Sequence, residues 1–324
     1  MSLVANSGSR SATSFREELA ACWRRVPDKG FFRALLAIWS ALFHFRGNAV
    51  FGWIDTPSLF RWMTWVFQTN SEDGHGILVP FIVLGLLWWK QEELLRLPTR
   101  LWWPALALVL FSLLLHAAGY LVQQTRVSIV AYFLGVYGII GLIWGPAWMK
   151  GTFFPMFLFV FCVPLGTMSD PLTFPLRMLV AKLTAGVSNH VFGIPVIRDG
   201  SQLLDPTGKY GYDVVAACSG IQSLSVLALV CTVYAFVHFE NPWRRALMVF
   251  AAIPLAIANN LARVLGIIVA EEAFGPQAGV LAHEYLGFAT FIGALVGMVA
   301  FGYLLREQPR GPLPGTVSTS NATA

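Results

Sequence analysis

The chain of 324 residues is 56% hydrophobic and only 12% charged, with a mean hydropathy of +0.63. This composition excludes a disordered chain or an ordinary soluble protein and indicates a polytopic membrane protein. The net charge of +5 is modest, and no basic run with interleaved aromatic residues points to nucleic acid as a partner. We therefore expect an all-α integral membrane protein whose surroundings are the lipid bilayer.

Eight apolar segments are predicted to cross the membrane, because a hydrocarbon core about 30 Å thick needs roughly 20 apolar residues per helix. They are residues 31–52, 76–90, 101–122, 127–148, 151–168, 219–238, 246–270 and 281–305. A ninth, more polar stretch over 176–194 is interpreted as an interfacial helix. Residues 1–30 are expected to form a cytoplasmic N-terminal segment, 31–305 the multi-pass domain and 306–324 a disordered cytoplasmic tail.

The lysines and arginines orient the eight spans, since cytoplasmic loops carry an excess of positive charge. With eight spans, every basic cluster falls on the cytoplasmic side, and so do the two termini. These clusters are Arg24 to Arg33, Lys90 to Arg100, Lys150, Arg244 with Arg245, and Arg306 with Arg310. The long region 169–217 then lies on the outer, periplasmic side of a cell inner membrane.

Two turn signals mark the end of this outer region. Arg198-Asp199-Gly200 and Asp205-Pro206-Thr207-Gly208 are flanked by short apolar stretches. They predict a small loop or β-hairpin over the membrane surface, directly before Cys218.

Three chemically reactive residues converge on that outer side. Cys218 opens the sixth span, Arg263 lies in the seventh and His283 in the eighth. Arg263 is seven residues before the predicted outward end of its span, about 10 Å deep. A charge inside a bilayer is costly, so an intramembrane arginine is a functional candidate.

These residue types suffice for acyl transfer through a thioester. The thiolate of Cys218 is the nucleophile, the planar fork of Arg263 stabilises a thiolate or an oxyanion, and His283 carries the proton. Each residue also has an ordinary reading. Cys218 is then a small packing residue, Arg263 a structural counter-ion, and His283 a polar residue at the interface.

Further residues are candidates for supporting or substrate-binding roles. Asn260 lies three residues before Arg263 on the same helix face, and Ser219 and Gly220 directly follow Cys218. His75 lies between two glycines at the outer start of the second span. No cysteine or histidine spacing suits zinc, so we expect neither a metal nor another cofactor.

The motifs that carry these residues resemble the exosortase/archaeosortase family. They are Gly74-His75-Gly76-Ile77-Leu78-Val79-Pro80, Ala217-Cys218-Ser219-Gly220-Ile221, Asn260-Leu261-Ala262-Arg263, and His283 followed by Gly287. Their order and spacing match over roughly residues 70–305. One departure is Gln222, where many members have a basic residue; it leaves the subtype and the recognition motif open.

The resemblance implies a multi-pass membrane cysteine protease/transpeptidase with Cys218 as nucleophile, Arg263 as stabiliser and His283 as acid and base. Its implied partners are exported membrane proteins with a C-terminal sorting signal: a Pro-Glu-Pro-like motif (PEP-CTERM), one transmembrane helix and a basic end. The acceptor that resolves the thioester is not specified. Two non-catalytic alternatives stay open, namely a transporter or lipid-binding channel and an assembly factor for surface polysaccharide.

Overall fold

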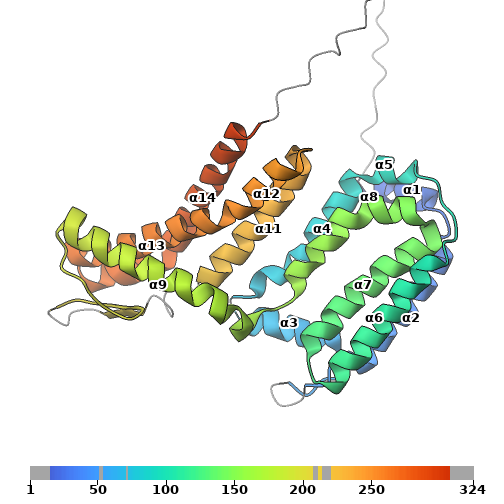
Figure 1. The fold of residues 1–324 in the computed structure, drawn as a ribbon, viewed down its shortest axis with the longest axis horizontal. Coiled ribbons are helices and arrows are strands. Elements are labelled where there is room, and N and C mark those ends of the chain that lie inside the picture. Colours follow the sequence, from blue (N-terminus) through green and yellow to red (C-terminus); the bar gives the residue numbers. More distant parts are fainter. Residues whose placement is uncertain (1–14, 51–53, 71, 207–210, 214–219, 307–324) are drawn as a thin grey trace, which may run out of the picture. The chain divides into compact units, whose positions relative to one another are not determined.

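The computed structural model describes residues 15–50, 54–70, 72–206, 211–213 and 220–306. Helices dominate these residues, which confirms the prediction of an all-α membrane protein (Figure 1). The chain divides after Gly166 into two compact units, Met1–Gly166 and Thr167–Ala324.

The first unit is a helical bundle centred on α7. Its helices are α1 Phe15–Arg25, α2 Lys29–Arg46, α3 Leu59–Thr69, η1 Gly74–Ile77, α4 Val79–Trp89, α5 Gln91–Leu95, α6 Pro104–Leu121, α7 Thr125–Trp144, α8 Pro146–Phe157 and η2 Leu158–Cys162. Helix α7 packs against α2, α6 and α8, and α4 packs against α8 (Figure 1). Small residues allow this close approach: the Trp39 ring of α2, for example, lies directly over Gly135 of α7.

The basic connections of the first unit gather at one end of its bundle. Trp144 Nε1, at the end of α7, donates to the carbonyl of Pro27 between α1 and α2 at 2.9 Å. Arg25 binds Glu92 of α5 at 2.7 Å, and this hydrogen bond lowers the pKa of the Glu92 carboxyl. The contacts therefore place these basic connections close together. The side of the membrane that they face stays a prediction.

The second unit combines helices with one small sheet. Its elements are η3 Gly166–Ser169 at the boundary, α9 Asp170–Val187, the π-helix η4 Ser188–Phe192, β1 Ile197–Asp199, β2 Gln202–Leu204, β3 Gly211–Asp213, α11 Gly220–His238, α12 Pro242–Phe250, α13 Ala252–Phe274 and α14 Pro276–Leu304. The strands pair antiparallel in the order β1-β2-β3. In the first hairpin Asp199 is opposite Gln202, and Gly200 takes a positive φ of 59° at its turn.

Two apolar cores hold the second unit together. One lies among α11, α12, α13 and α14 and includes Leu227, Met248 and Met298. The other joins α9, the sheet and α13, where Leu203 of β2 packs with Val264 and Ile268. The predicted hairpin is therefore present, and it shares an apolar core with α9 and α13.

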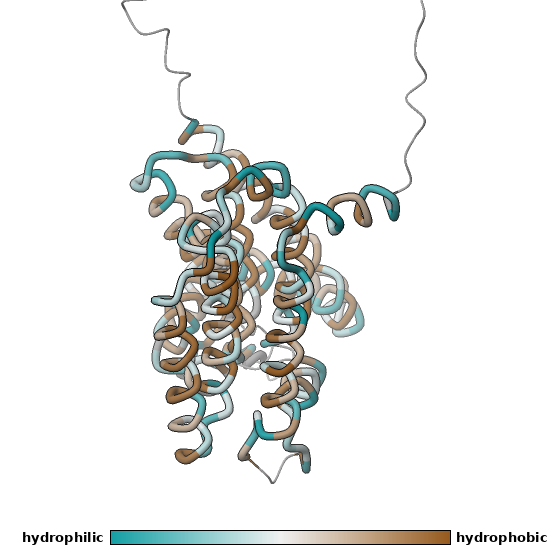
Figure 2. The backbone as a smooth tube through the Cα atoms, turned by 90° about the vertical axis from the view of Figure 1, so that its right-hand side faces the viewer, coloured by the Kyte–Doolittle hydropathy of each residue, from teal (hydrophilic) through white to brown (hydrophobic). Residues whose placement is uncertain are grey.

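The eight predicted spans correspond to helices, but not all of these helices have the length of a span. Four helical stretches of the described residues are long and apolar enough to cross a membrane: Pro104–Leu121, Thr125–Trp144, Pro242–Phe274 and Pro276–Leu304. Gly74–Trp89, Pro146–Cys162 and Ser223–His238 are shorter apolar helices. Hydrophobic residues recur along the helical backbone drawn in Figure 2. The chain is a multi-pass membrane protein, and the count of eight spans stays a prediction.

The last two helices extend beyond their predicted spans. Helix α13 continues to Phe274 and α14 begins at Pro276, so that Gly275 alone connects them. Gly275 has a φ of 88°, which only glycine adopts readily, and proline suits the first turn of the next helix. Arg263 is consequently eleven residues from the end of α13, a rise of about 16 Å along the helix axis at 1.5 Å per residue, while its predicted depth in the membrane stays a prediction.

Candidate functional site

Arg263 and His283 lie next to each other on neighbouring helices of the second unit. Arg263 Nη2 donates to the backbone carbonyl of His283 at 3.3 Å. The two side chains are partly exposed. The structure thus brings together two of the three predicted catalytic residues, and the contact runs through the His283 backbone, which leaves the imidazole ring free of this hydrogen bond.

Gly287 gives the guanidinium its place against α14. A β-carbon at Gly287 would lie 3.2 Å from Arg263 Cζ and 3.3 Å from Nε. Contacts of this kind are tighter than ordinary van der Waals packing. The absence of a side chain at this position therefore lets Arg263 lie flat along α14, one turn after His283.

Three buried polar atoms on this part of α13 have no hydrogen-bond partner among the residues that the structure describes. They are Asn259 Oδ1, Asn260 Oδ1 and Arg263 Nε. Asn259 and Asn260 are only 5% and 7% exposed. Because buried polar groups are almost always paired, a cluster of three such atoms within two turns of one helix is typical of a site that binds something else.

No hydrogen bond joins Asn260 to Arg263 among the described residues. The carbonyl oxygen of Asn260 is therefore available to another donor, and its role as a supporting or substrate-binding residue stays a prediction.

The start of α11 is tied to the same region of α13. Asn259 Nδ2 donates to Ser223 Oγ at 3.3 Å, and Ser223 lies in the first turn of α11. The sequence reasoning did not select Asn259 or Ser223. A signal for Asn259 was available, because it lies four residues before Arg263 and hence on the same helix face.

Cys218 and Ser219 lie outside the described residues. Gly220, the fourth residue of their motif, is the first residue of α11. In the sequence, Cys218 is therefore two residues before the helix that contacts α13 through Ser223.

His75 belongs to a separate part of the chain, in the first unit. It lies in η1, where its Nδ1 is 3.3 Å from the carbonyl oxygen of Glu72. The next residue, Gly76, is buried against the ring of Phe67, and Asp73 accepts from Leu165 N at 3.0 Å. These contacts fix the loop that carries His75; its membership of the site with Arg263 stays a prediction.

A comparison with protein-family models decides the family. The model described as transmembrane exosortase (Exosortase_EpsH) matches residues 62–300, well over half of the chain. The chain belongs to the exosortase family. No curated protein and no solved structure matches it.

The exosortase match includes every residue selected as a candidate for the site, from His75 to His283. It leaves out α1 and α2, which precede residue 62. The resemblance found in the four motifs is thus confirmed at the level of the family, while the roles of individual residues in this exosortase are matters for experiment.

Proposed function

We propose that this exosortase is a membrane cysteine protease/transpeptidase that cleaves the C-terminal sorting signal of exported proteins and transfers them to an acceptor. The cluster formed by Arg263, the His283 backbone and the unpaired oxygens of Asn259 and Asn260 supports this proposal most directly. Membership of the exosortase family supplies the reaction class. The Pro-Glu-Pro-like motif of the substrate comes from the family resemblance.

The first half of the reaction forms a thioester. The thiolate of Cys218 attacks the carbonyl carbon of the scissile peptide, and the oxygen becomes an oxyanion. Arg263 stabilises that oxyanion, with its unpaired Nε–H as the available donor. The C–N bond then breaks, and His283 donates a proton to the departing amine.

The second half releases the exported protein from the enzyme. An acceptor amine or a water molecule loses a proton to His283 and attacks the thioester carbonyl. The carbon–sulfur bond breaks, which regenerates the Cys218 thiolate. The oxygen of Asn260, buried and unpaired, accepts a backbone N–H of the substrate and holds the chain in register during the two steps.

The decisive experiment compares two cysteine variants on a tagged protein that carries a sorting signal. Cys218→Ala abolishes processing, because no other group replaces the nucleophile. Cys231→Ala is the matched control, since Cys231 is fully buried in the apolar core of α11 and its loss leaves processing intact. Full processing by Cys218→Ala would refute the proposal and favour a non-catalytic transporter or assembly factor.

A trapping experiment tests the intermediate itself. The substrate is incubated with the wild-type enzyme at neutral pH, the reaction is quenched with acid, in which thioesters hydrolyse slowly, and the products are analysed by mass spectrometry. We expect a substrate fragment attached to the peptide that contains Cys218. A fragment attached elsewhere, or processing with no attached fragment in any trapping condition, contradicts the proposed route.

A further inference from the structure

A large apolar cavity lies in the first unit, inside its basic end. Its volume is about 420 Å³, within the range of roughly 300–1,000 Å³ of pockets that bind small molecules. Helices α1, α2, α4, α5, α7 and α8 supply its walls. Representative residues are Trp23, Phe32, Leu87, Val136, Trp148 and Met156.

One wall of the cavity carries an unsatisfied hydrogen-bond donor. Trp148 is 5% exposed, and its Nε1 has no hydrogen-bond partner among the residues that the structure describes. Its neighbour Trp144 differs, because its own Nε1 donates to the carbonyl of Pro27. A buried N–H without a partner costs free energy, which indicates that a ligand acceptor satisfies it.

Water is a poor occupant for this donor. A buried water molecule needs two to four polar partners, and the walls of the cavity are almost wholly apolar. The hydroxyl of Thr152, which also lines the cavity, donates to the carbonyl of Trp148 at 2.8 Å. The occupant that fits is a mostly hydrocarbon molecule with one acceptor group.

Two cationic side chains lie beside Trp23, in the part of the cavity formed by α1. The guanidinium of Arg33 lies 5.8 Å from the ring centroid of Trp23, which lines the cavity. Lys29 Nζ donates to the carbonyls of Trp23 and Arg24, at 3.3 and 2.8 Å. The carboxylate of Glu92 is bound to Arg25, so it does not neutralise Lys29 or Arg33.

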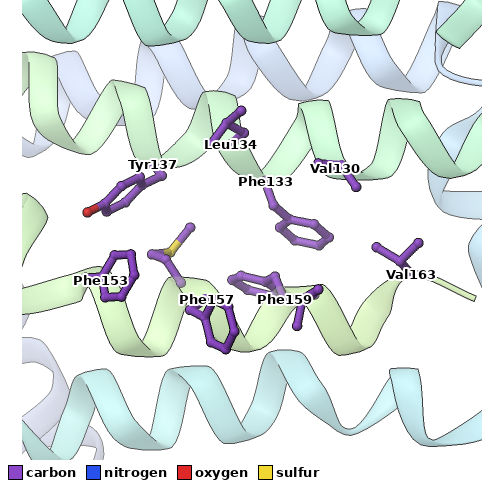
Figure 3. A pocket seen from close by; sticks show the side chains of 10 residues that line it. Val130, Phe133, Leu134, Tyr137, Phe153, Phe157, Phe159 and Val163 are labelled. Atoms are coloured by element: carbon purple, nitrogen blue, oxygen red, sulfur yellow. The ribbon is translucent and has the colours of Figure 1, made fainter. Parts of the chain in front are cut away.

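A second hollow of about 250 Å³ adjoins the cavity along α7 and α8. Phe133, Met156 and Phe159 line the cavity and the hollow alike. Figure 3 shows the aromatic rings that form the hollow, among them Phe133 and Phe159, whose centroids are 4.0 Å apart in a stacked pair. Two adjoining apolar spaces suit a molecule with two hydrocarbon chains.

We propose that this cavity is a binding site for one anionic diacyl phospholipid. One acyl chain fills the cavity and the other follows the adjoining hollow. An ester carbonyl accepts the N–H of Trp148, and the phosphate lies beside Lys29 and Arg33. In this arrangement Trp148 lies at the level of the ester groups, at the membrane interface, where tryptophan is enriched. In this proposal, the helices α1 and α2, which lie outside the family match, help to bind the phospholipid.

The test uses the full-length protein in phosphatidylethanolamine vesicles that contain a trace of phosphatidylglycerol with a diazirine in one acyl chain. After illumination, mass spectrometry locates the lipid adducts. We expect them on the cavity walls of α4, α7 and α8, near Leu87, Val136 and Met156. Adducts spread evenly over the exposed faces of all helices would overturn the proposal.

Three variants sharpen the test. Val136→Trp fills the cavity and removes most adducts at its walls, whereas Leu114→Trp, at a position 69% exposed on α6, leaves them unchanged. Trp148→Phe keeps a ring but removes the donor, which reduces the adducts about fivefold, the effect of one hydrogen bond. Unchanged wall adducts in Val136→Trp contradict the site.

The headgroup is tested with the same diazirine in phosphatidylcholine, which carries no net charge. We expect weaker adducts than with phosphatidylglycerol, and the difference disappears in the Lys29→Gln, Arg33→Gln double variant. Equal labelling by the two lipids in the wild-type protein would overturn the assignment to an anionic lipid. Thermal unfolding of each variant in detergent verifies that the bundle is intact.

Discussion

At the scale of single residues, the second unit holds a partly exposed arginine, Arg263, whose buried Nε does not use its hydrogen-bonding capacity among the described residues. Arg263 Nη2 donates a hydrogen bond to the His283 carbonyl, and Arg263 Nε has no partner among the described residues. A hydrogen-bond donor that is buried without a partner raises the free energy of the folded protein. In the proposed reaction, the oxyanion accepts a hydrogen bond from this donor.

Arg263→Lys tests whether the planar fork matters. Lysine keeps the positive charge but loses the paired, fixed donors of a guanidinium. We expect processing to fall by about two to three orders of magnitude, the usual effect of removing one oxyanion donor. The rate of sorting-signal cleavage by purified enzyme is the measurement. If Arg263→Lys works at the wild-type rate, Arg263 is a structural counter-ion.

Gly287→Ala tests whether the position of the Arg263 guanidinium matters, because this substitution leaves Arg263 itself in place. The added methyl presses on the guanidinium from 3.2 Å, and the end of a flexible side chain can move away. We therefore expect slower cleavage, by about tenfold, with a normal amount of folded protein. Gly293→Ala, on the same helix with open space around it, is the control and keeps the wild-type rate. Equal rates for the two variants contradict the assigned geometry.

Part of this site could be predicted from the residues alone. The position of Arg263 near His283 followed from the span count, because an arginine in an apolar helix is a strong signal. Asn259 and Ser223 were missed, since a polar residue in a helix has many uses and only packing shows which one applies. The backbone contact from Arg263 to His283 depends on how α13 and α14 meet, which no residue pattern specifies.

At the scale of elements, small residues decide which helices come into contact. Gly76 in η1 is the clearest case in the first unit, because the ring of Phe67 from α3 occupies the space where a side chain would begin. The contact fixes the connection between α3 and α4, and with it the loop that carries His75.

Gly76→Ala is expected to destabilise the first unit. A β-carbon at this position would lie 2.5 Å from Phe67 Cε1, and Phe67 is only 8% exposed. Overpacking of this kind costs about 1–3 kcal/mol. The temperature of half-maximal unfolding in detergent should fall accordingly.

The control for this change is Gly85→Ala in α4, where nothing lies within 4 Å. Alanine is the better helix former by about 1 kcal/mol, so the same measurement should show an unchanged or higher unfolding temperature. A Gly76→Ala protein as stable as Gly85→Ala would show that the Phe67 ring has room to move.

Helix existence was easier to predict than helix ends. Apolar runs of span length identified α6, α7, α13 and α14, because long hydrophobic stretches leave few alternatives. The helices α13 and α14 continue beyond the predicted spans, to Phe274 and back to Pro276, because a helix can extend past the apolar run that predicts a span. The turn signals at Gly200 predicted the first hairpin, while the third strand required the register shown by the structure.

At the scale of the whole molecule, the charge pattern makes a prediction about orientation. In the first unit, the basic connections lie together at one end. In the second, Arg244 Nη1 donates to the carbonyl of Leu305 at 3.0 Å, which places the basic residues of α12 beside those after α14. These two groups of connections are the ones that the positive-inside rule would put on the cytoplasmic side, and the orientation stays a prediction.

Reporter fusions test this orientation. A reporter inserted at Pro98, between α5 and α6, and one placed after Arg306 should register as cytoplasmic. A reporter inserted at Ser201, in the turn between β1 and β2, should register as external. The same signal at Ser201 and Pro98 would contradict the predicted arrangement of spans.

The single-residue connection at Gly275 has a consequence for how the protein is synthesised and inserted into the membrane. Helices α13 and α14 form one continuous hairpin, so they can leave the translocation machinery as a pair. His283 is synthesised 20 residues after Arg263, which takes about 1–4 s at ordinary rates of translation. Arg263 can therefore contact α14 soon after α13 enters the lipid. Its charge is then not left without a partner helix in the membrane during insertion.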